Sequence, residues 1–131
     1  MPISFSVDNS NELIRAEAVG AITRAEIERH LSEERRAGGI SYRELIDATQ
    51  ATAAFDAADA RSLIDTVRAI VRTTDFGPTA VIVADNMTYG MLRMLEILLE
   101  DVCDVRPFRP PERDAAELWV RRMPIRPRIE S

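Results

Sequence analysis

The sequence predicts an α/β fold in which a largely parallel, mixed sheet opens with a β-hairpin and carries helices packed against it. Stretches with the two-residue apolar period of strands alternate with stretches that repeat about every 3.6 residues, as helices do, in the order β-β-α-β-α-β-α-β-α. The stretch PTAVIVAD, residues 78–85, is apolar almost without interruption. Such a run is typical of a strand that is covered on both faces of a parallel sheet.

The chain opens with the two strands of the hairpin. Ile3, Phe5 and Val7 alternate with polar residues, which indicates a half-buried strand. The turn-forming cluster DNSN follows at residues 8–11, and residues 13–19 form the second strand. Two strands separated by a short turn are expected to pair with each other as a hairpin.

The first helix has a recognisable beginning and end. Thr23 with Glu26 three residues later forms a capping box, which marks the start of the helix. Gly38 and Gly39 mark its end, because glycine adopts without strain the backbone conformation that closes a helix. A third strand is expected at residues 44–49.

The rest of the chain continues the alternation up to a basic tail. The expected elements are a helix at about residues 57–72, a strand at 78–85, a helix at 88–102, a short strand at 105–108 and a last amphipathic helix at 112–122. Residues 1–124 are therefore expected to form a single domain. The basic residues 125–131 are expected to form a flexible C-terminal tail.

Composition excludes several classes of function. The net charge of -5 argues against a nucleic-acid-binding protein, which usually presents a basic face. All 17 cationic residues are arginine, so a Schiff-base lysine, a lysine general base and the phosphate-binding lysine of a nucleotide loop are excluded. Neither a GxGxxG nor a GxxxxGK[ST] motif occurs in the sequence. No cofactor is expected.

The single cysteine, Cys103, bears on the cellular setting. One cysteine cannot form an intrachain disulfide, so a reducing cytoplasm is the expected location. The first residues lack the basic region and apolar run of a signal peptide. No apolar stretch approaches the roughly 20 residues of a membrane span. Cys103 itself is expected to be a small buried residue rather than a nucleophile.

Several stretches together resemble a known family. They are AVGAITRAEIERHL, RELIDATQATAAFDAADARSLIDTVRAI, PTAVIVADNMTYGMLRMLEIL and VRPFRPPERDAAELWV. Over about residues 3–120, the chain resembles the SpoIIAA-like, STAS-type domains of anti-sigma-factor antagonists, and more closely the STAS-like bacterial proteins of this length. The resemblance implies a SpoIIAA-like fold and a regulatory function exerted through binding to another protein.

The turn after the third strand departs from that family. In the antagonists it reads Asp-Ser-Ser-Gly, and a kinase phosphorylates a serine there to break a protein–protein contact. Aligned on Asp56, this chain has Ala57, Ala58 and Asp59, and the nearest downstream hydroxyl is that of Ser62 within the helix. The resemblance therefore implies a non-enzymatic protein-interaction module that lacks the phosphorylatable serine.

The acidic residues around that turn have a structural and a functional interpretation. Asp56 is placed to cap the following helix with Asp59 at the third helical position, where both charges favour the positive end of the helix dipole. The alternative is a partner- or ligand-binding surface at the helix start. Ala58, Asp85 and Tyr89 are its further candidate residues.

A metal-dependent enzyme is a further alternative. Asp47 and Asp85 are expected near the carboxyl ends of two parallel strands, the edge where such sheets bind ligands. Together with Asp56 they would make a Mg²⁺-binding cluster like that of a response-regulator receiver, but a receiver also needs a lysine, which this chain lacks. If the chain is instead the non-enzymatic interaction module, no metal ion and no catalytic residue are expected.

The only histidine gives no recognisable active site. His30 lies inside the first helix, on the same side as Ile27 and Glu34. It has no histidine or cysteine companion at the spacing of metal ligands, and no Ser-His-Asp arrangement is apparent. Trp119 is expected to anchor the last helix in the core.

The helix expected at residues 88–102 is apolar over an arc of roughly 220°, against roughly 120° for the helix at 57–72. One flank of this arc carries Leu92, Leu95 and Leu99. The other carries Met87, Met91, Met94 and Leu98. If the leucines pack on the sheet, the second flank either packs against neighbouring helices or forms an interface, for which a homodimer is the expected form.

Three function classes therefore stay open. The first is the regulatory protein-interaction module, whose partner the sequence does not name. The second is a small-ligand or lipid-binding STAS-like sensor, in which the apolar helix at residues 88–102 would line a pocket. The third is the metal-dependent enzyme that uses Asp47 and Asp85.

Overall fold

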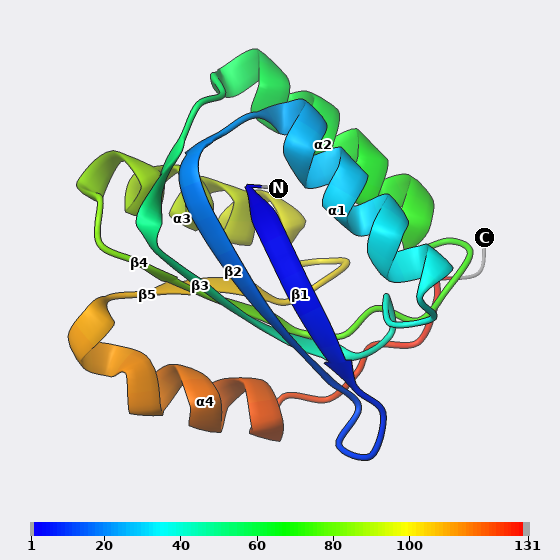
Figure 1. Cartoon of the computed structure of the whole chain (residues 1–131). Coiled ribbons are helices and arrows are strands. Elements are labelled where there is room, and N and C mark those ends of the chain that lie inside the picture. Colours follow the sequence, from blue (N-terminus) through cyan, green and yellow to red (C-terminus); the bar gives the residue numbers. More distant parts are fainter. Residues whose placement is uncertain (1, 130–131) are drawn as a thin grey trace.

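The structure is a computed structural model that describes residues 2–129 (Figure 1). Its sheet has five strands in the order β1-β2-β3-β4-β5. These strands are β1 (Ile3–Asp8), β2 (Leu13–Ile22), β3 (Arg43–Ala53), β4 (Thr79–Val83) and β5 (Val105–Phe108). β1 pairs antiparallel with β2, and the other neighbours are parallel. The opening hairpin and the largely parallel mixed sheet that the sequence predicts are confirmed.

The helices divide unequally between the two faces of the sheet (Figure 1). They are α1 (Arg24–Arg36), α2 (Ala57–Ile70), α3 (Asn86–Leu99) and α4 (Arg113–Arg122), the last preceded by the 3₁₀ turn η1 (Pro110–Glu112). The first three each connect two adjacent parallel strands. Because such connections turn with one hand and the strands are added in one direction, α1, α2 and α3 share a face. α4 follows the last strand and covers the opposite face.

The face under α4 is densely packed. Leu45 of β3 and Ala80 and Ile82 of β4 point to it, and all three are buried. Ala116 and Val120 of α4 are fully buried against them. The remaining members of this cluster are Leu13, Phe108 and the partly buried Trp119. The predicted role of Trp119 as a core anchor of α4 is confirmed.

β3 is longer than the sequence predicts. The expected strand ends at residue 49, whereas β3 runs to Ala53. Its last residues pair with Val19–Ile22 of β2 after a register shift, beyond the end of β4. β2 and β3 thus extend as a two-stranded ribbon past the rest of the sheet.

The expected helix ends are present. Thr23 Oγ1 accepts a hydrogen bond from the backbone N–H of Glu26 at 3.3 Å. Gly38 has a φ of +76°, which an L-residue adopts only with strain, and the chain turns there after α1. Asp56 and Asp59 form a reciprocal capping box at the start of α2, as predicted.

The segment after α4 returns along the molecule. Arg126 forms an antiparallel bridge with Phe76, just before β4. Its guanidinium donates two hydrogen bonds of 2.9 Å to Asp104 and one to the carbonyl of Glu100. The backbone N–H of Ile129 donates to the carbonyl of Val71. The domain boundary after residue 124 and the flexibility of the tail stay predictions, and residues 130–131 lie outside the described part.

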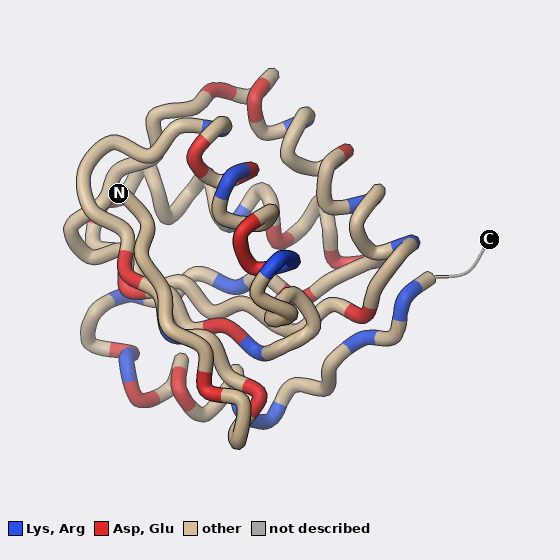
Figure 2. The backbone as a smooth tube through the Cα atoms, turned by 45° about the vertical axis from the view of Figure 1, so that its right-hand side comes forward, with Lys and Arg blue, Asp and Glu red and all other residues tan. Residues whose placement is uncertain are grey.

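Charge is mixed over the molecule. Figure 2 shows acidic and basic residues interspersed along α1 and α4 rather than gathered on a basic stripe. None of the helices in residues 2–129 is long and apolar enough to cross a membrane.

Candidate functional site: an apolar cavity under three helices

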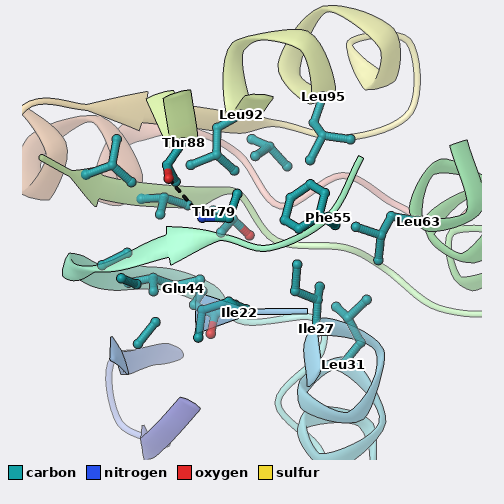
Figure 3. Close-up of a pocket in the computed structure, with 18 of the residues that line it drawn as sticks. Ile22, Ile27, Leu31, Glu44, Phe55, Leu63, Thr79, Thr88, Leu92 and Leu95 are labelled. Carbon is teal, nitrogen blue, oxygen red and sulfur yellow. Dashed lines mark hydrogen bonds between the residues drawn. The ribbon is translucent and has the colours of Figure 1, made fainter. Parts of the chain in front are cut away.

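A cavity of about 170 Å³ lies between the sheet and helices α1, α2 and α3 (Figure 3). The sheet forms its floor, and the apolar side chains of the helices form its roof. Ile27 and Leu31 point toward it from α1, Leu63 from α2, and Leu92 and Leu95 from α3. Phe55, in the connection between β3 and α2, closes part of the wall.

Part of the cavity floor is built from small residues, beside larger ones such as Ile46 and Val83. Ala18, Ala48, Ala51 and Ala53 occupy inward positions of β2 and β3. A methyl group at each of these positions fills less space than a valine or leucine would, which leaves room below the roof. Protein interiors are normally close-packed, so a space of this size is a specific feature of the sequence. Ala51 and Ala53 belong to the ribbon that extends beyond β4.

Two of the polar side chains at the cavity wall, Thr88 and Glu44, already have hydrogen-bond partners. The Thr88 hydroxyl accepts a hydrogen bond of 2.9 Å from the backbone N–H of Ala53 and donates one of 2.6 Å to Asp85. Glu44, at the other side of the floor, is bonded to His30. The remaining lining is almost wholly hydrocarbon, so the cavity is suited to an apolar occupant.

The predicted acidic surface lies outside the cavity. Asp56 and Asp59 cap α2, and Asp85 caps α3 by accepting from the N–H and hydroxyl of Thr88. These hydrogen bonds from Thr88 lower the pKa of Asp85. Ala58 is exposed in the first turn of α2. The ring of Tyr89 lies under the Arg109 guanidinium at 4.0 Å. A role of these residues in binding stays a prediction.

The structure does not bring Asp47, Asp56 and Asp85 together as a metal-binding group within the described residues. Asp47 accepts hydrogen bonds from the backbone and hydroxyl of Thr49 and from Arg113. Partial burial raises the pKa of Asp47, but the hydrogen bonds from Thr49 and Arg113 outweigh burial and lower it. Because each carboxylate already has local partners, the receiver-like Mg²⁺ cluster is not formed.

A different polar cluster, which sequence reasoning missed, lies beside the cavity. His30 and Glu34, one turn apart on α1, face Glu44 of β3, and each of the three side chains is at most 7% exposed. His30 Nε2 is 2.6 Å from Glu44 Oε2 and 3.2 Å from Glu34 Oε1. The spacing of four residues between His30 and Glu34 was the visible signal, because it puts both on one side of a helix.

Burial, and then the neighbouring Glu44 carboxylate, raise the pKa of Glu34 far above its ordinary value of 4.5. Glu34 is therefore protonated near neutral pH. This carboxylic acid and the imidazole of His30 both face Glu44, which also lines the cavity. The three residues make a buried group that holds a proton and offers one nitrogen and two carboxyl ligands.

The single cysteine has the structural role that the sequence predicts. Cys103 is 2% exposed and packs among Val67, Ile70 and Leu99. Burial raises the pKa of its thiol to about 12, so the thiolate needed for nucleophilic chemistry is not populated near neutral pH.

The two flanks of α3 differ in exposure, as the sequence predicts. On the leucine flank, Leu95 and Leu99 are buried. On the other flank, the side chain of Met87 is 74% exposed and that of Leu98 is 47% exposed. Met91 and Met94 are half-buried. Ile97 adds a further exposed side chain to the same helix. Self-association through Met87, Met91, Met94 and Leu98 stays a prediction.

Comparison with known proteins establishes the fold. No protein-family model matches the chain, and no curated protein matches it. Among solved structures, the chain is similar to an uncharacterised protein of the DUF3478 family with a SpoIIAA-like fold from Shewanella loihica. The TM-score is 0.56 at 18% sequence identity, over 90% of this chain and 93% of that chain. The chain has a SpoIIAA-like fold, as its sequence predicts.

Proposed function

We propose that this SpoIIAA-like domain is a non-enzymatic regulatory module that binds a small apolar ligand in the cavity under α1, α2 and α3. The observation that carries the proposal is the cavity itself, about 170 Å³ in volume and lined almost wholly by hydrocarbon. Apolar cavities of about 150 Å³ in proteins accept benzene. The ligand class is therefore a single aromatic ring or a short alkyl chain.

The composition of the floor supports this function. Replacing Ala48 or Ala51 with a larger apolar residue would fill the space, and a filled core is more stable than one with a cavity. A ligand that enters gains the hydrophobic free energy that the alanines leave unused. Because the hydroxyl of Thr88 already bonds to Ala53 and Asp85, an apolar ligand does not leave it unpaired.

The test is a binding experiment with defined probes and a variant that fills the cavity. Benzene, indole and hexanoate are titrated into the protein, and the change in melting temperature is measured together with the methyl NMR spectrum. We expect at least one probe to raise the melting temperature and to shift the methyl signals of Leu63 and Leu95. Ala51→Leu should abolish both effects, because its side chain occupies the cavity floor.

A matched variant controls for the added volume. Ala69→Leu places the same side chain on the exposed side of α2 and should bind the probes as the parent does. The proposal is wrong if the parent binds none of the probes, or if Ala51→Leu is folded and binds them with the parent's affinity. Native mass spectrometry of the protein as purified would identify a ligand acquired from the cell.

The exposed apolar side chains of α3 support a second candidate function, a protein-interaction module without a phosphorylation switch. Met87, Ile97 and Leu98 are each about half exposed or more, which is unusual for large apolar residues gathered on one helix. The proposed setting is the cytoplasm, since Cys103 is buried and needs no oxidising compartment. A pull-down in which the parent recovers one stoichiometric protein and Leu98→Glu does not would favour this function.

A further inference from the structure

One side of α1 concentrates buried polar atoms that lack a hydrogen-bond partner. Within the described residues, the buried side-chain atoms of this kind are Glu26 Oε2, His30 Nδ1 and Glu34 Oε1. All three belong to the same helix, within nine residues of each other. Buried polar atoms are normally paired, since leaving one unpaired costs free energy. A ligand or a water that reaches these atoms would satisfy them.

The donor atoms suit a metal ion. His30 Nε2 and one oxygen from each of Glu34 and Glu44 lie within 4.8 Å of one another. His30 Nε2 is hydrogen-bonded to Glu44 Oε2 at 2.6 Å, whereas Glu34 Oε1 has no hydrogen-bond partner although it lies 3.2 Å from the same nitrogen. A cation between the three groups would give each of them a partner at once.

His30 also lines a second, smaller feature. A cavity of about 10 Å³, the size of one water molecule, is lined by Glu26, His30, Arg29 and the start of β1. A water there would accept a hydrogen bond from His30 Nδ1–H and donate one to Glu26 Oε2, which are the two remaining unpaired atoms. Metal-bound histidines are held in this way, because a bonded Nδ1–H leaves the Nε2 lone pair free for the metal.

We propose that His30 Nε2 and the carboxylates of Glu34 and Glu44 bind one divalent transition-metal ion. The mixed imidazole and carboxylate set fits Zn²⁺, Fe²⁺ or Mn²⁺, and lacks the thiolates that select copper(I). At ligand distances of about 2.1 Å, tetrahedral ligands are about 3.4 Å apart. The pair formed by His30 and Glu34 is close to this spacing at 3.2 Å, and Glu44 must retreat from its contact of 2.6 Å.

This inference is independent of the proposed apolar ligand. Three protein ligands leave a fourth position open, and the site borders the cavity because Glu44 lines it. Metal binding nevertheless needs no occupant in the cavity, so either proposal can fail without the other.

The test is calorimetric titration of chelator-treated protein with ZnCl₂ near neutral pH. We expect one Zn²⁺ per chain and a rise in the melting temperature on binding. Glu44→Gln and His30→Gln should each weaken binding by at least about tenfold, since even the loss of an outer partner of a ligand costs that much. Circular dichroism establishes that each variant is folded.

Glu34→Gln keeps the experiment decisive if the other two variants do not fold. Glutamine has nearly the shape of glutamate and fits the same buried position, so we expect the fold to be retained while a carboxylate ligand is lost. Glu28 is half-buried on α1 in an ion pair with Arg24, and Glu28→Gln is the matched control that should bind as the parent does. The inference is overturned if the parent binds no Zn²⁺, or if Glu34→Gln binds it as tightly as the parent.

Discussion

Asp56 and Asp59 hold the start of α2 by a reciprocal pair of hydrogen bonds. Asp56 accepts from the Asp59 backbone N–H at 2.9 Å, and Asp59 accepts from the Asp56 backbone N–H at 3.1 Å. On the sequence resemblance, the pair occupies the turn that corresponds to the phosphorylatable serine of SpoIIAA-type antagonists. In this chain the turn therefore has a structural function that needs no hydroxyl.

Asp56→Ala is expected to lower the melting temperature by about 4 °C, because the helix loses its cap. Asp56→Ser, which keeps a capping oxygen, should stay close to the parent. The hydrogen bond from Asp59 lowers the pKa of Asp56, so the cap contributes above the ordinary pKa of 3.8 and is lost as the pH falls below it. Equal melting temperatures for the parent and Asp56→Ala would contradict the capping function.

Glu34→Gln is expected to change how stability depends on pH. In the folded, metal-free protein Glu34 keeps its proton, whereas in the unfolded chain it loses it above about pH 4.5. Because the unfolded state binds fewer protons, the free energy of unfolding falls as the pH rises through this range. Glutamine does not titrate, so the variant should be more stable than the parent at about pH 8 and similar to it at about pH 4.

Urea unfolding at a series of pH values measures this difference. Glu28→Gln is again the control, since its half-buried carboxylate already has Arg24 as an ion-pair partner. The expectation fails if the pH profiles of Glu34→Gln and the parent run parallel.

Arg126→Ala is expected to reduce the free energy of unfolding by about 1–2 kcal/mol, because a two-pronged, charge-assisted contact with Asp104 is lost. Arg126→Lys should recover only part of this, since an ammonium cannot reproduce the fork of a guanidinium. Arg122→Ala, at the exposed end of α4, should have little effect. Chemical unfolding of the three variants measures the series. No loss in Arg126→Ala would mean that the segment is not bound to the body in solution.

The exposed flank of α3 is expected to form a homodimer interface at tens of micromolar. Met87→Glu and Leu98→Glu should then give folded monomers, because a buried unpaired carboxylate is costly at an interface. Leu118→Glu, equally exposed but on α4, should stay dimeric. Light scattering after gel filtration distinguishes the species. If the parent protein is monomeric at this concentration, the predicted homodimer interface is wrong.

Most of the fold can be predicted because its signals are local. The apolar run of β4 and the capping residues of α1 and α2 need no knowledge of distant contacts. The end of β3 is different. Residues 50–53 read QATA, and alanine carries little preference for strands. They are extended because they pair with β2, and that pairing depends on tertiary structure.

The site is harder to predict for a related reason. The spacing of His30 and Glu34 is visible in the sequence, but Glu44 joins them only when α1 packs over β3. The cavity forms between small side chains in part of the sheet and large side chains on the helices above them. Its volume depends on how far apart sheet and helices lie, and no stretch of sequence specifies that distance alone.

The unequal division of the helices has a consequence for handling the protein. α4 alone covers one face of the sheet, where Leu45 and Ile82 are buried beneath it. If the chain is cut before Arg113, or if α4 detaches, the apolar side chains on that face of the sheet become exposed to water as one continuous patch. Such surfaces drive aggregation during folding. We therefore expect deletion of the ten residues of α4 to reduce the yield of soluble protein more than deletion of ten residues from α1, α2 or α3.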